Sequence, residues 1–316
     1  MGVQTTVTKE KMMTQRITSG QIAQLSQMAE SAVRKAIPEV FVSMSITQTD
    51  AQYLVEHGKD FQEYCVTIFT KALLDLFDKN VVDTEVLSKN GYLMHKGVPS
   101  IEAQLDILHT LFPQIGKANA EIVKKIQEGH IVYSDIPLRV PSEDRGVWAI
   151  PHWSKIGNSY PEALEKVLSL LEKTQGTANY LKERYGYEYI RETEQKKQAM
   201  TLLLYQQQSD IILLQTQLGI RHRGMSIYRA NKSMDTHEFG LGAYEVGIIL
   251  LLYPERLEKS TDLWIDCSGD EFSPIAGGPF KATPLFKMIH NLTIRARFDS
   301  ANETCGAASG FVNSWK

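Results

Sequence analysis

Cysteine is scarce in this sequence, and its cysteines are not spaced for a metal or redox motif. The 316 residues include three cysteines, Cys65, Cys267 and Cys305. They lie far apart, which excludes zinc ribbons and thioredoxin-like sites, because both need a CxxC pair. An odd number of isolated cysteines indicates reduced thiols, as in a cytoplasmic protein.

Long apolar stretches are also missing. The longest apolar run, Val246–Tyr253, is far shorter than the roughly 20 residues that a membrane-spanning helix needs. Residues 1–20 lack the apolar core of a signal peptide. The sequence therefore predicts a cytoplasmic protein with no membrane partner.

Neither net charge nor a short catalytic motif identifies a function. The formal net charge is -3, so no global basic field attracts nucleic acid. The motifs HExxH, HxH and GxSxG do not occur in the sequence, which excludes the hydrolase classes that they mark. Any functional prediction must therefore depend on local groups of residues.

The pattern of apolar residues, prolines and glycines predicts an α+β fold that is mainly helical. Residues 133–160 hold several prolines and glycines, which exclude long helices. Trp148 and Trp153 indicate that this connection is ordered, because large aromatic side chains are usually buried. We expect four parts: a helical region at 1–132, an ordered Pro/Trp-rich connection at 133–160, a long helical hairpin at 161–218 and a small mixed α/β unit at 219–316.

The hairpin prediction depends on apolar spacing. Pro161 is suited to the first turn of a helix, and an apolar stripe follows it. Leu204, Ile211 and Leu218 are spaced evenly by one heptad, which favours a helix over 177–218 that packs along its neighbour. Two interpretations stay open, a structural hairpin within one chain and a homo-oligomer formed through residues 177–218.

The last third of the chain combines helix and strand patterns. Phe239–Leu252 is apolar on most sides and predicts a buried helix. Leu263–Ile265 predicts a short buried strand, and the alternation in Leu292–Phe298 predicts a strand at a sheet edge. The residues that we expect in the core are Ile248, Leu250, Leu251 and Trp264.

An acidic loop follows the first of these strands. Asp266, Ser268, Asp270 and Glu271 lie around Gly269, which allows a tight turn. Carboxylates suit a hard divalent cation, which would make Asp266 and Asp270 catalytic candidates of a metal-assisted hydrolase. The alternative is a solvated turn whose Asp side chains cap backbone groups. Between Asp266 and Asp270 we expect arginine rather than a metal ion, because basic residues lie just upstream.

Those basic residues are the candidate ligand-binding group. No acid interrupts the segment that holds Arg221, Arg223, Arg229 and Lys232. Guanidinium groups bind phosphate and carboxylate well, so the segment suits a phosphate-bearing ligand such as a nucleotide or nucleic acid. The alternative is ion pairing with acidic residues of the same unit, namely Asp266, Asp270, Glu271 and Glu245.

Two histidines in the same region are candidates for catalysis. His222 or His237 could act as a base, with Cys267 as the nucleophile. An isolated histidine is more often a hydrogen-bonded structural residue, and a cysteine at a strand end is usually a small buried apolar residue. The sequence leaves both interpretations open.

Four segments, HRGMSIYRA, EFGLGAYEVGIILLLYPERL, LWIDCSGDEFSP and GAASGF, resemble an uncharacterised bacterial protein family. The resemblance covers residues 219–316 and implies that this third is a unit around which residues 1–218 vary. The family has no known activity, so the resemblance implies no catalytic residues. The basic stretch from Lys287 to Arg297 departs from the more acidic and aromatic pattern of the family.

The leading hypothesis is an anion-binding or interaction module that uses Arg221 and Arg223. The first alternative is a metal-assisted hydrolase built on Asp266–Glu271, with a divalent cation as its cofactor. The second is a structural oligomer formed through residues 177–218.

Overall fold

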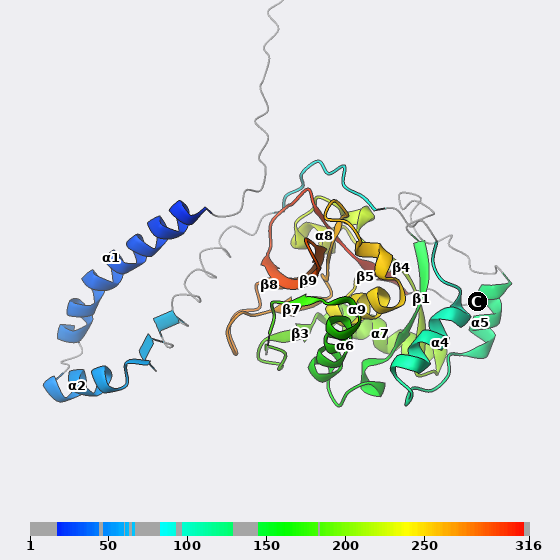
Figure 1. Cartoon of the computed structure of the whole chain (residues 1–316), viewed down its shortest axis with the longest axis horizontal. Helices are drawn as coiled ribbons and strands as arrows, with labels where there is room; N and C mark the ends of the chain where they lie inside the picture. The colour runs from blue at the N-terminus through cyan, green and yellow to red at the C-terminus, as the bar shows by residue number, and fades with distance from the viewer. Residues whose placement is uncertain are drawn as a thin grey trace, which may run out of the picture. The chain divides into compact units, whose positions relative to one another are not determined.

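The computed structural model describes residues 18–43, 47–59, 61–62, 65–66, 83–92, 97–128, 145–182 and 184–312 (Figure 1). The chain divides into two compact units, Met1–Ile68 and Phe69–Lys316. The predicted boundaries at 132, 160 and 218 therefore fall inside the second unit. Among the described residues, no helix combines the length and the apolar content that crossing a membrane requires.

The first unit contains two described helices, α1 (Ser19–Ser43) and α2 (Gln48–Glu56). Thr18 and Gln21 exchange hydrogen bonds between side chain and backbone at the start of α1. This reciprocal pattern is a capping box, which satisfies N–H groups that the first turn leaves without partners.

The second unit contains a four-stranded antiparallel sheet in the order β1-β4-β11-β5. Its strands are β1 (Arg145–Pro151), β4 (Ile211–Gln217), β5 (Glu238–Gly240) and β11 (Ser309–Phe311). Every residue of β4 is buried, and β4 pairs with β1 along one edge and with β11 along part of the other.

A second, seven-stranded sheet has the path β10-β6-β8-β7-β3, with β9 beside β8 and β2 beside β9. Its strands are β2 (Ala178–Asn179), β3 (Ile190–Glu192), β6 (Trp264–Asp266), β7 (Asp270–Phe272), β8 (Ala282–Met288), β9 (Leu292–Phe298) and β10 (Cys305–Ala307). The turn between β6 and β7 contacts the last residue of β5. A Cβ atom on Gly269 would lie 2.1 Å from the carbonyl oxygen of Gly240, so only glycine fits this contact.

Helices cover the sheets of the second unit. They are α4 (Ile101–Leu111), α5 (Ala120–Gln127), α6 (Tyr160–Gln175), α7 (Glu194–Gln207), α8 (Ile227–Ser233) and α9 (Ala243–Leu252). Short 3-10 helices are η3 (Trp153–Lys155), η4 (Ile220–His222) and η5 (Pro254–Leu257).

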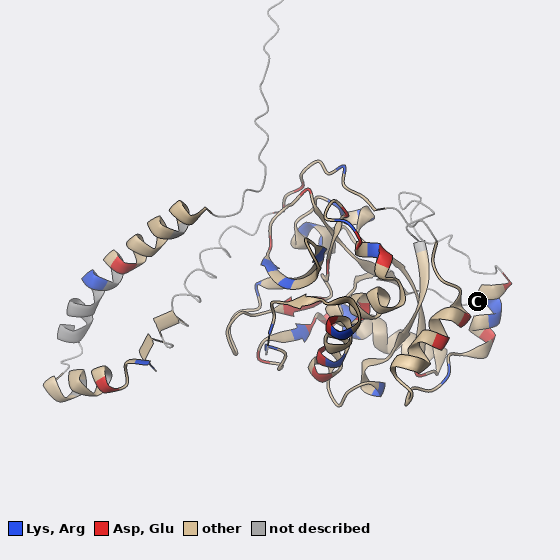
Figure 2. Cartoon of the chain, in the orientation of Figure 1, with Lys and Arg blue, Asp and Glu red and all other residues tan. Residues whose placement is uncertain are grey.

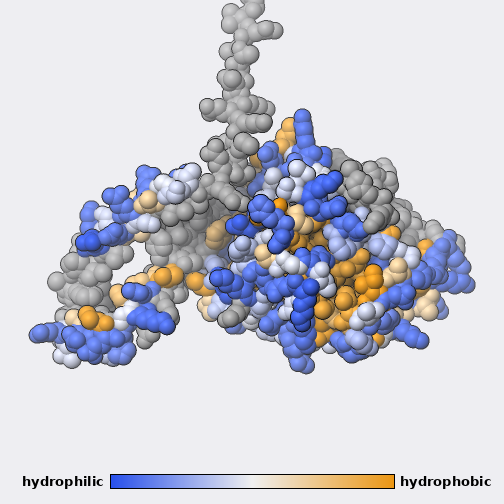
Figure 3. All heavy atoms as spheres, viewed as in Figure 1, coloured by the Kyte–Doolittle hydropathy of each residue, from blue (hydrophilic) through white to orange (hydrophobic). Residues whose placement is uncertain are grey.

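Helix α9 is buried along its whole length and packs against α6, β1 and α4. Gly247 makes the contact with α6 close, because a Cβ atom there would lie 2.7 Å from Cγ1 of Val167. On the face in Figure 3, apolar surface gathers in the area that α4, α6 and α9 occupy in Figure 1. The core of the second unit is thus centred on α9.

The prediction of a mainly helical fold with a long hairpin at 161–218 is wrong. The described residues form two sheets, of four and seven strands, in addition to the helices. Helix α6 forms as expected, but 177–218 contains β2, β3, α7 and β4 rather than one helix. Ile211 and Ile212 are β-branched and begin a continuous buried run, which a strand inside a sheet accommodates well. The oligomer hypothesis required the 177–218 helix and loses its basis with it.

Other sequence predictions are closer to the structure. Trp148 is in β1 and is 1% exposed, so part of the 133–160 connection is a core strand. The predicted helix at Phe239–Leu252 is α9, which begins at Ala243 because Phe239 belongs to β5. Ile248, Leu250 and Leu251 are buried, whereas Trp264 is only partly buried.

Candidate functional site

The carboxylates of the predicted acidic loop each have a different cationic partner. Asp266 accepts two hydrogen bonds from Arg297, at 2.7 and 2.8 Å. Asp270 pairs with Lys196 at 3.1 Å, and Glu271 pairs with Arg191 at 2.7 Å. The prediction of an upstream arginine between Asp266 and Asp270 is wrong, because Asp266 is bound by Arg297 from β9 and Asp270 by a lysine on α7. Nowhere in the described part of the chain do three or more His, Cys, Asp or Glu side chains form a group that could hold a metal ion.

Lys196 is the centre of a buried charge cluster. Its Nζ atom lies 2.8 Å from Glu245, 3.1 Å from Asp270 and 3.4 Å from Glu192, and its side chain has no exposed surface. Nζ also donates to the hydroxyl of Tyr160 at 2.9 Å. The cluster therefore joins α6, α7, α9 and the seven-stranded sheet around one lysine.

The start of α9 completes this cluster. The backbone N–H of Ala243 donates to Oδ2 of Asp270 at 2.7 Å, and that of Gly242 donates to Oε2 of Glu245 at 3.0 Å. The hydroxyl of Tyr160 donates to the same oxygen of Asp270 at 2.5 Å. The positive end of the helix dipole and the free N–H groups of its first turn stabilise both carboxylates.

One lysine faces three carboxylates, and the pKa values reflect this imbalance. Burial raises the pKa of Glu245 to about 7, and the negative charges of Asp270 and Glu192 add to the effect against the opposing pull of Lys196. Burial alone would lower the pKa of Lys196, but the three carboxylates hold it above its usual value. Lys196 therefore carries a positive charge at neutral pH. Glu245 binds or releases a proton near pH 7.

Cys267 does not fit the role of nucleophile. Its side chain is fully buried, and burial together with Asp270 and Asp266 raises the pKa of its thiol well above the usual value. The reactive form of cysteine is the thiolate. Cys267 is therefore an inert residue of the core.

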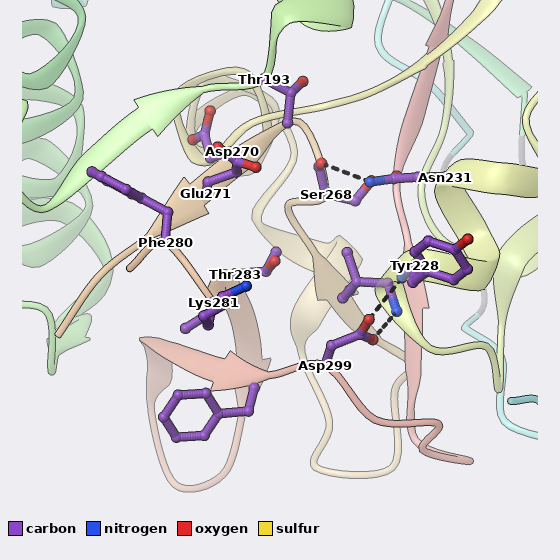
Figure 4. Close-up of a pocket in the computed structure, with 13 residues that line it drawn as sticks. Thr193, Tyr228, Asn231, Ser268, Asp270, Glu271, Phe280, Lys281, Thr283 and Asp299 are labelled. Atoms are coloured by element: carbon purple, nitrogen blue, oxygen red, sulfur yellow. Dashed lines mark hydrogen bonds between the residues drawn. The ribbon is translucent and has the colours of Figure 1, made fainter. Parts of the chain in front are cut away.

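A cavity of about 260 Å³ lies beside Asp270, between α8 and the strands β7, β8 and β9. Figure 4 shows Phe280 and Tyr228 on opposite sides of it, with Lys281 and Thr283 between them. The other residues that line it are Thr193, Ile227, Asn231, Ser268, Asp270, Glu271, Ala282, Phe298 and Asp299.

Two polar atoms of lining residues lack a partner. Ser268 is 2% exposed, and neither its Oγ atom nor Oδ1 of Asn231 has a hydrogen-bond partner among the described residues. The amide nitrogen of Asn231 donates to the carbonyl of Ser268 at 3.5 Å, which fixes the two residues relative to each other (Figure 4). Buried polar atoms without partners are rare, and each calls for an explanation such as a ligand or water.

Asp299 fixes the helix that forms one wall of the cavity. Its carboxylate accepts the backbone N–H groups of Ile227 and Tyr228 at 2.6 and 3.1 Å, at the start of α8 (Figure 4). Burial raises the pKa of Asp299, although these two N–H groups act in the opposite direction. Tyr228 is thereby placed at the mouth of the cavity, with 46% of its surface exposed.

The predicted basic ligand group does not converge on one point. Arg221 pairs with Asp235 at 2.7 Å and with Glu238 at 3.0 Å. Arg223 donates to the carbonyl of Asn90 at 3.3 Å. On the face in Figure 2, basic and acidic residues are interspersed over the second unit.

The remaining two basic residues share a partner. Arg229 pairs with Asp83 and Glu85, and Lys232 pairs with Asp83 at 2.9 Å. These contacts follow the ion-pairing alternative, although the acids are Asp83, Glu85, Asp235 and Glu238 rather than those of the acidic loop.

The two candidate histidines have different environments. His222 is 1% exposed, and its Nε2 atom lies 2.8 Å from Oε1 of Glu238. His237 is exposed. Burial alone would raise the pKa of Glu238, but the hydrogen bonds from His222 and Ser309 and the charge of Arg221 hold it below its usual value.

Lys196 and Glu192 were not predicted from the sequence, whereas Glu245 was named as an ion-pairing acid, although its partner is Lys196 rather than an arginine. Glu245 carried a signal, because it is the single acid in the otherwise apolar segment of α9. Lys196 carried none, since α7 is rich in polar residues on all sides. Comparisons with protein-family models, curated proteins and solved structures gave no match to this chain. The resemblance of residues 219–316 to an uncharacterised bacterial family therefore stays a prediction.

Proposed function

We propose that this protein binds a small, uncharged, hydroxyl-bearing ring compound in the cavity between α8 and the seven-stranded sheet. The observation that carries the proposal is the cavity itself, which the exposed rings of Tyr228 and Phe298 line together with the carboxylates of Glu271 and Asp299.

The polar side chains that line the cavity restrict the ligand. Ionised carboxylates accept hydrogen bonds only. Glu271 and Asp299 both line the cavity, so a ligand rich in hydrogen-bond donors, such as hydroxyl groups, fits best.

The aromatic residues favour a ligand with an apolar ring face. Tyr228, Phe280 and Phe298 line the cavity, and Tyr228 and Phe298 are 46% and 39% exposed. The guanidinium of Arg191 lies 4.0 Å from the ring centre of Phe280 and fixes that ring. Exposed aromatic rings beside polar groups are typical of small-molecule sites, and the volume of about 260 Å³ limits the ligand to one or two rings.

Charge pairing favours an uncharged ligand over a polycation. Glu271 is paired with Arg191, and Asp270 is paired with Lys196. The charge of Glu271 is thus balanced, and the Asp270 side chain has no exposed surface. A sugar or a nucleoside meets these requirements.

Calorimetric titration and thermal shift with glucose, N-acetylglucosamine, adenosine, uridine, choline, spermidine, phosphate and ATP test the proposal. We expect saturable binding in the sugar or nucleoside group. Tyr228→Ala should weaken that binding by about tenfold, as expected for the loss of one aromatic stacking partner. Tyr205→Ala removes a tyrosine that is 76% exposed on α7 and is the matched control, because it should leave binding unchanged.

Binding of choline or spermidine alone would show that the ligand is a cation. Binding of phosphate or ATP that is lost in Arg223→Ala would restore the anion hypothesis. If no compound binds, or if the two tyrosine variants behave alike, the cavity is not the binding site.

A further inference from the structure

A second group of polar side chains meets at the last residue of α8, and none of them lines the cavity. Ser233 ends α8, and its Oγ atom lies 3.2 Å from Nδ1 of His222. The other ring nitrogen of His222 lies 2.8 Å from Oε1 of Glu238. Ser233 is exposed, whereas the side chains of His222 and Glu238 are 1% and 0% exposed. The accessible hydroxyl of Ser233 thus contacts a buried imidazole, and this imidazole contacts a buried carboxylate.

We propose that Ser233, His222 and Glu238 form a nucleophilic site that accepts acyl groups from carboxylic esters. The arrangement matches the general form of an activated nucleophile, in which a base contacts the hydroxyl and a third group orients the base. This site is independent of the proposed ligand cavity, because none of its three residues lines that cavity.

The contacts of Glu238 fix the orientation of the imidazole. Oε1 of Glu238 accepts a hydrogen bond from Ser309, and Oε2 lies 3.0 Å from Nε of Arg221. The carboxylate is therefore held ionised and immobile. It accepts the proton on Nε2 of His222, which leaves Nδ1 free to accept a proton from Ser233.

The reaction balances with water as the only co-reactant. Oγ of Ser233 forms a bond to the ester carbonyl carbon while its proton passes to Nδ1 of His222. The ester C–O bond then breaks, and the alcohol leaves with that proton. Water repeats the two steps on the acyl-serine, releases the carboxylic acid and restores Ser233.

The surroundings of Ser233 indicate slow turnover and a small acyl group. Its hydroxyl also lies 2.8 Å from the carbonyl of Ala230 and 3.7 Å from the sulfur of Met225. A hydroxyl proton bound to Ala230 must rotate towards His222 before reaction. Because carbonyl groups rather than N–H groups end a helix, an oxyanion beside Ser233 is poorly stabilised. Covalent capture of the serine is therefore the more sensitive readout.

The chain contains its own control. His152 and Ser154 also form a histidine–serine pair, with Nδ1 and Oγ 2.7 Å apart on the exposed surface. Within the described residues, no carboxylate is recorded in hydrogen-bond contact with His152. The two pairs differ in the buried carboxylate, which is the feature that the proposal requires.

The test is reaction of the full chain with a fluorophosphonate probe, followed by peptide mapping and by hydrolysis assays with p-nitrophenyl acetate. We expect Ser233 to be labelled at least ~10²-fold faster than Ser154, and a folded His222→Gln variant to lose this advantage. Ser233→Ala should abolish labelling and p-nitrophenyl acetate hydrolysis, whereas Ser154→Ala should change neither. Equal labelling of the two serines, or no labelling of Ser233, would overturn the proposal.

Because His222 is buried, His222→Gln could fail to fold. Ser233→Cys and Ser154→Cys then give a second measurement, the rate of alkylation by iodoacetamide. A rate at least ~10-fold higher at position 233 supports activation by the buried pair, since the thiolate is the reactive form. Equal rates contradict it.

Discussion

Nζ of Lys196 lies 3.1 Å from Oδ1 of Asp270, and neither side chain has any exposed surface. This ion pair links α7 to the first residue of β7, and the N–H of Ala243 connects it to α9. Three segments that are distant in the sequence are therefore held by charges that water does not reach.

Lys196→Met should destabilise the protein by about 3–5 kcal/mol. Methionine fills most of the same volume but leaves Asp270 and Glu245 buried without their cation. The free energy of unfolding in urea, followed by circular dichroism, measures the effect. Lys197→Met, which changes the exposed neighbour, should stay within about 0.5 kcal/mol of the wild type. Equal stability of the two variants would show that the cluster is not formed in solution.

Stability should fall as the pH rises from 4.5 towards 8, through the contribution of Glu245. Its pKa is raised to about 7 in the folded protein from a usual value of 4.5. Between these values the folded state binds more protons than the unfolded state, so stability decreases with pH. Since one pKa unit corresponds to about 1.4 kcal/mol, the loss is at most about 3.5 kcal/mol.

Glu245→Gln isolates this contribution, because the glutamine side-chain oxygen can still accept the hydrogen bond of the Gly242 N–H but does not titrate. Subtracting its pH profile from that of the wild type removes the effects of all other groups. A difference that is flat between pH 4.5 and 8 would contradict the raised pKa.

Asp266→Asn and Glu271→Gln compare a buried and an exposed ion pair of the same loop. Arg297 is 11% exposed and binds Asp266 with two nitrogens, so loss of the carboxylate should cost about 3–5 kcal/mol. Arg191 and Glu271 are 49% and 39% exposed, and loss of that pair should cost about 1 kcal/mol or less. Thermal unfolding of both variants provides the measurement, and similar losses would mean that Asp266 is not buried with Arg297.

Gly247→Ala should destabilise the protein by about 1–3 kcal/mol, although alanine is the better helix former. The added methyl group would lie 2.7 Å from Cγ1 of Val167 on α6. The double variant Gly247→Ala, Val167→Ala should recover part of the loss, because Val167→Ala removes the colliding group. Strictly additive effects of the two substitutions would show that α6 and α9 are not in this contact.

The sequence predicted those elements that local patterns define. The apolar run of α9 and the alternation in β9 follow from residues close together in the chain. β4 was predicted as helix because Leu204, Ile211 and Leu218 are one heptad apart. Its pairing with β1 joins Arg145 to Gln217, which are far apart in sequence. No local pattern encodes such pairings.

In the candidate sites, too, local features were predicted from the sequence, whereas contacts between distant segments were not. Ion pairing of the acidic residues was predicted, since opposite charges in one unit attract, but the partners Lys196 and Arg191 lie outside the segment that the patterns marked. The cavity residue Ser268 was noted as a loop residue, whereas the burial of its Oγ atom without a hydrogen-bond partner among the described residues depends on the approach of this loop to Gly240. The histidine pair with Glu238 required the fold to bring η4 and β5 together.

The order of the four-stranded sheet has a consequence for synthesis on the ribosome. β5 joins β4 only through β11, and Gly240 pairs with Ser309, roughly 70 residues later. At translation rates of about 5–20 residues per second, several seconds pass between the appearance of these partners. During that interval one edge of β4, whose residues are all buried in the folded protein, lacks its native partner strand. The nascent chain therefore exposes an unpaired strand edge that is prone to aggregate and that a chaperone could cover.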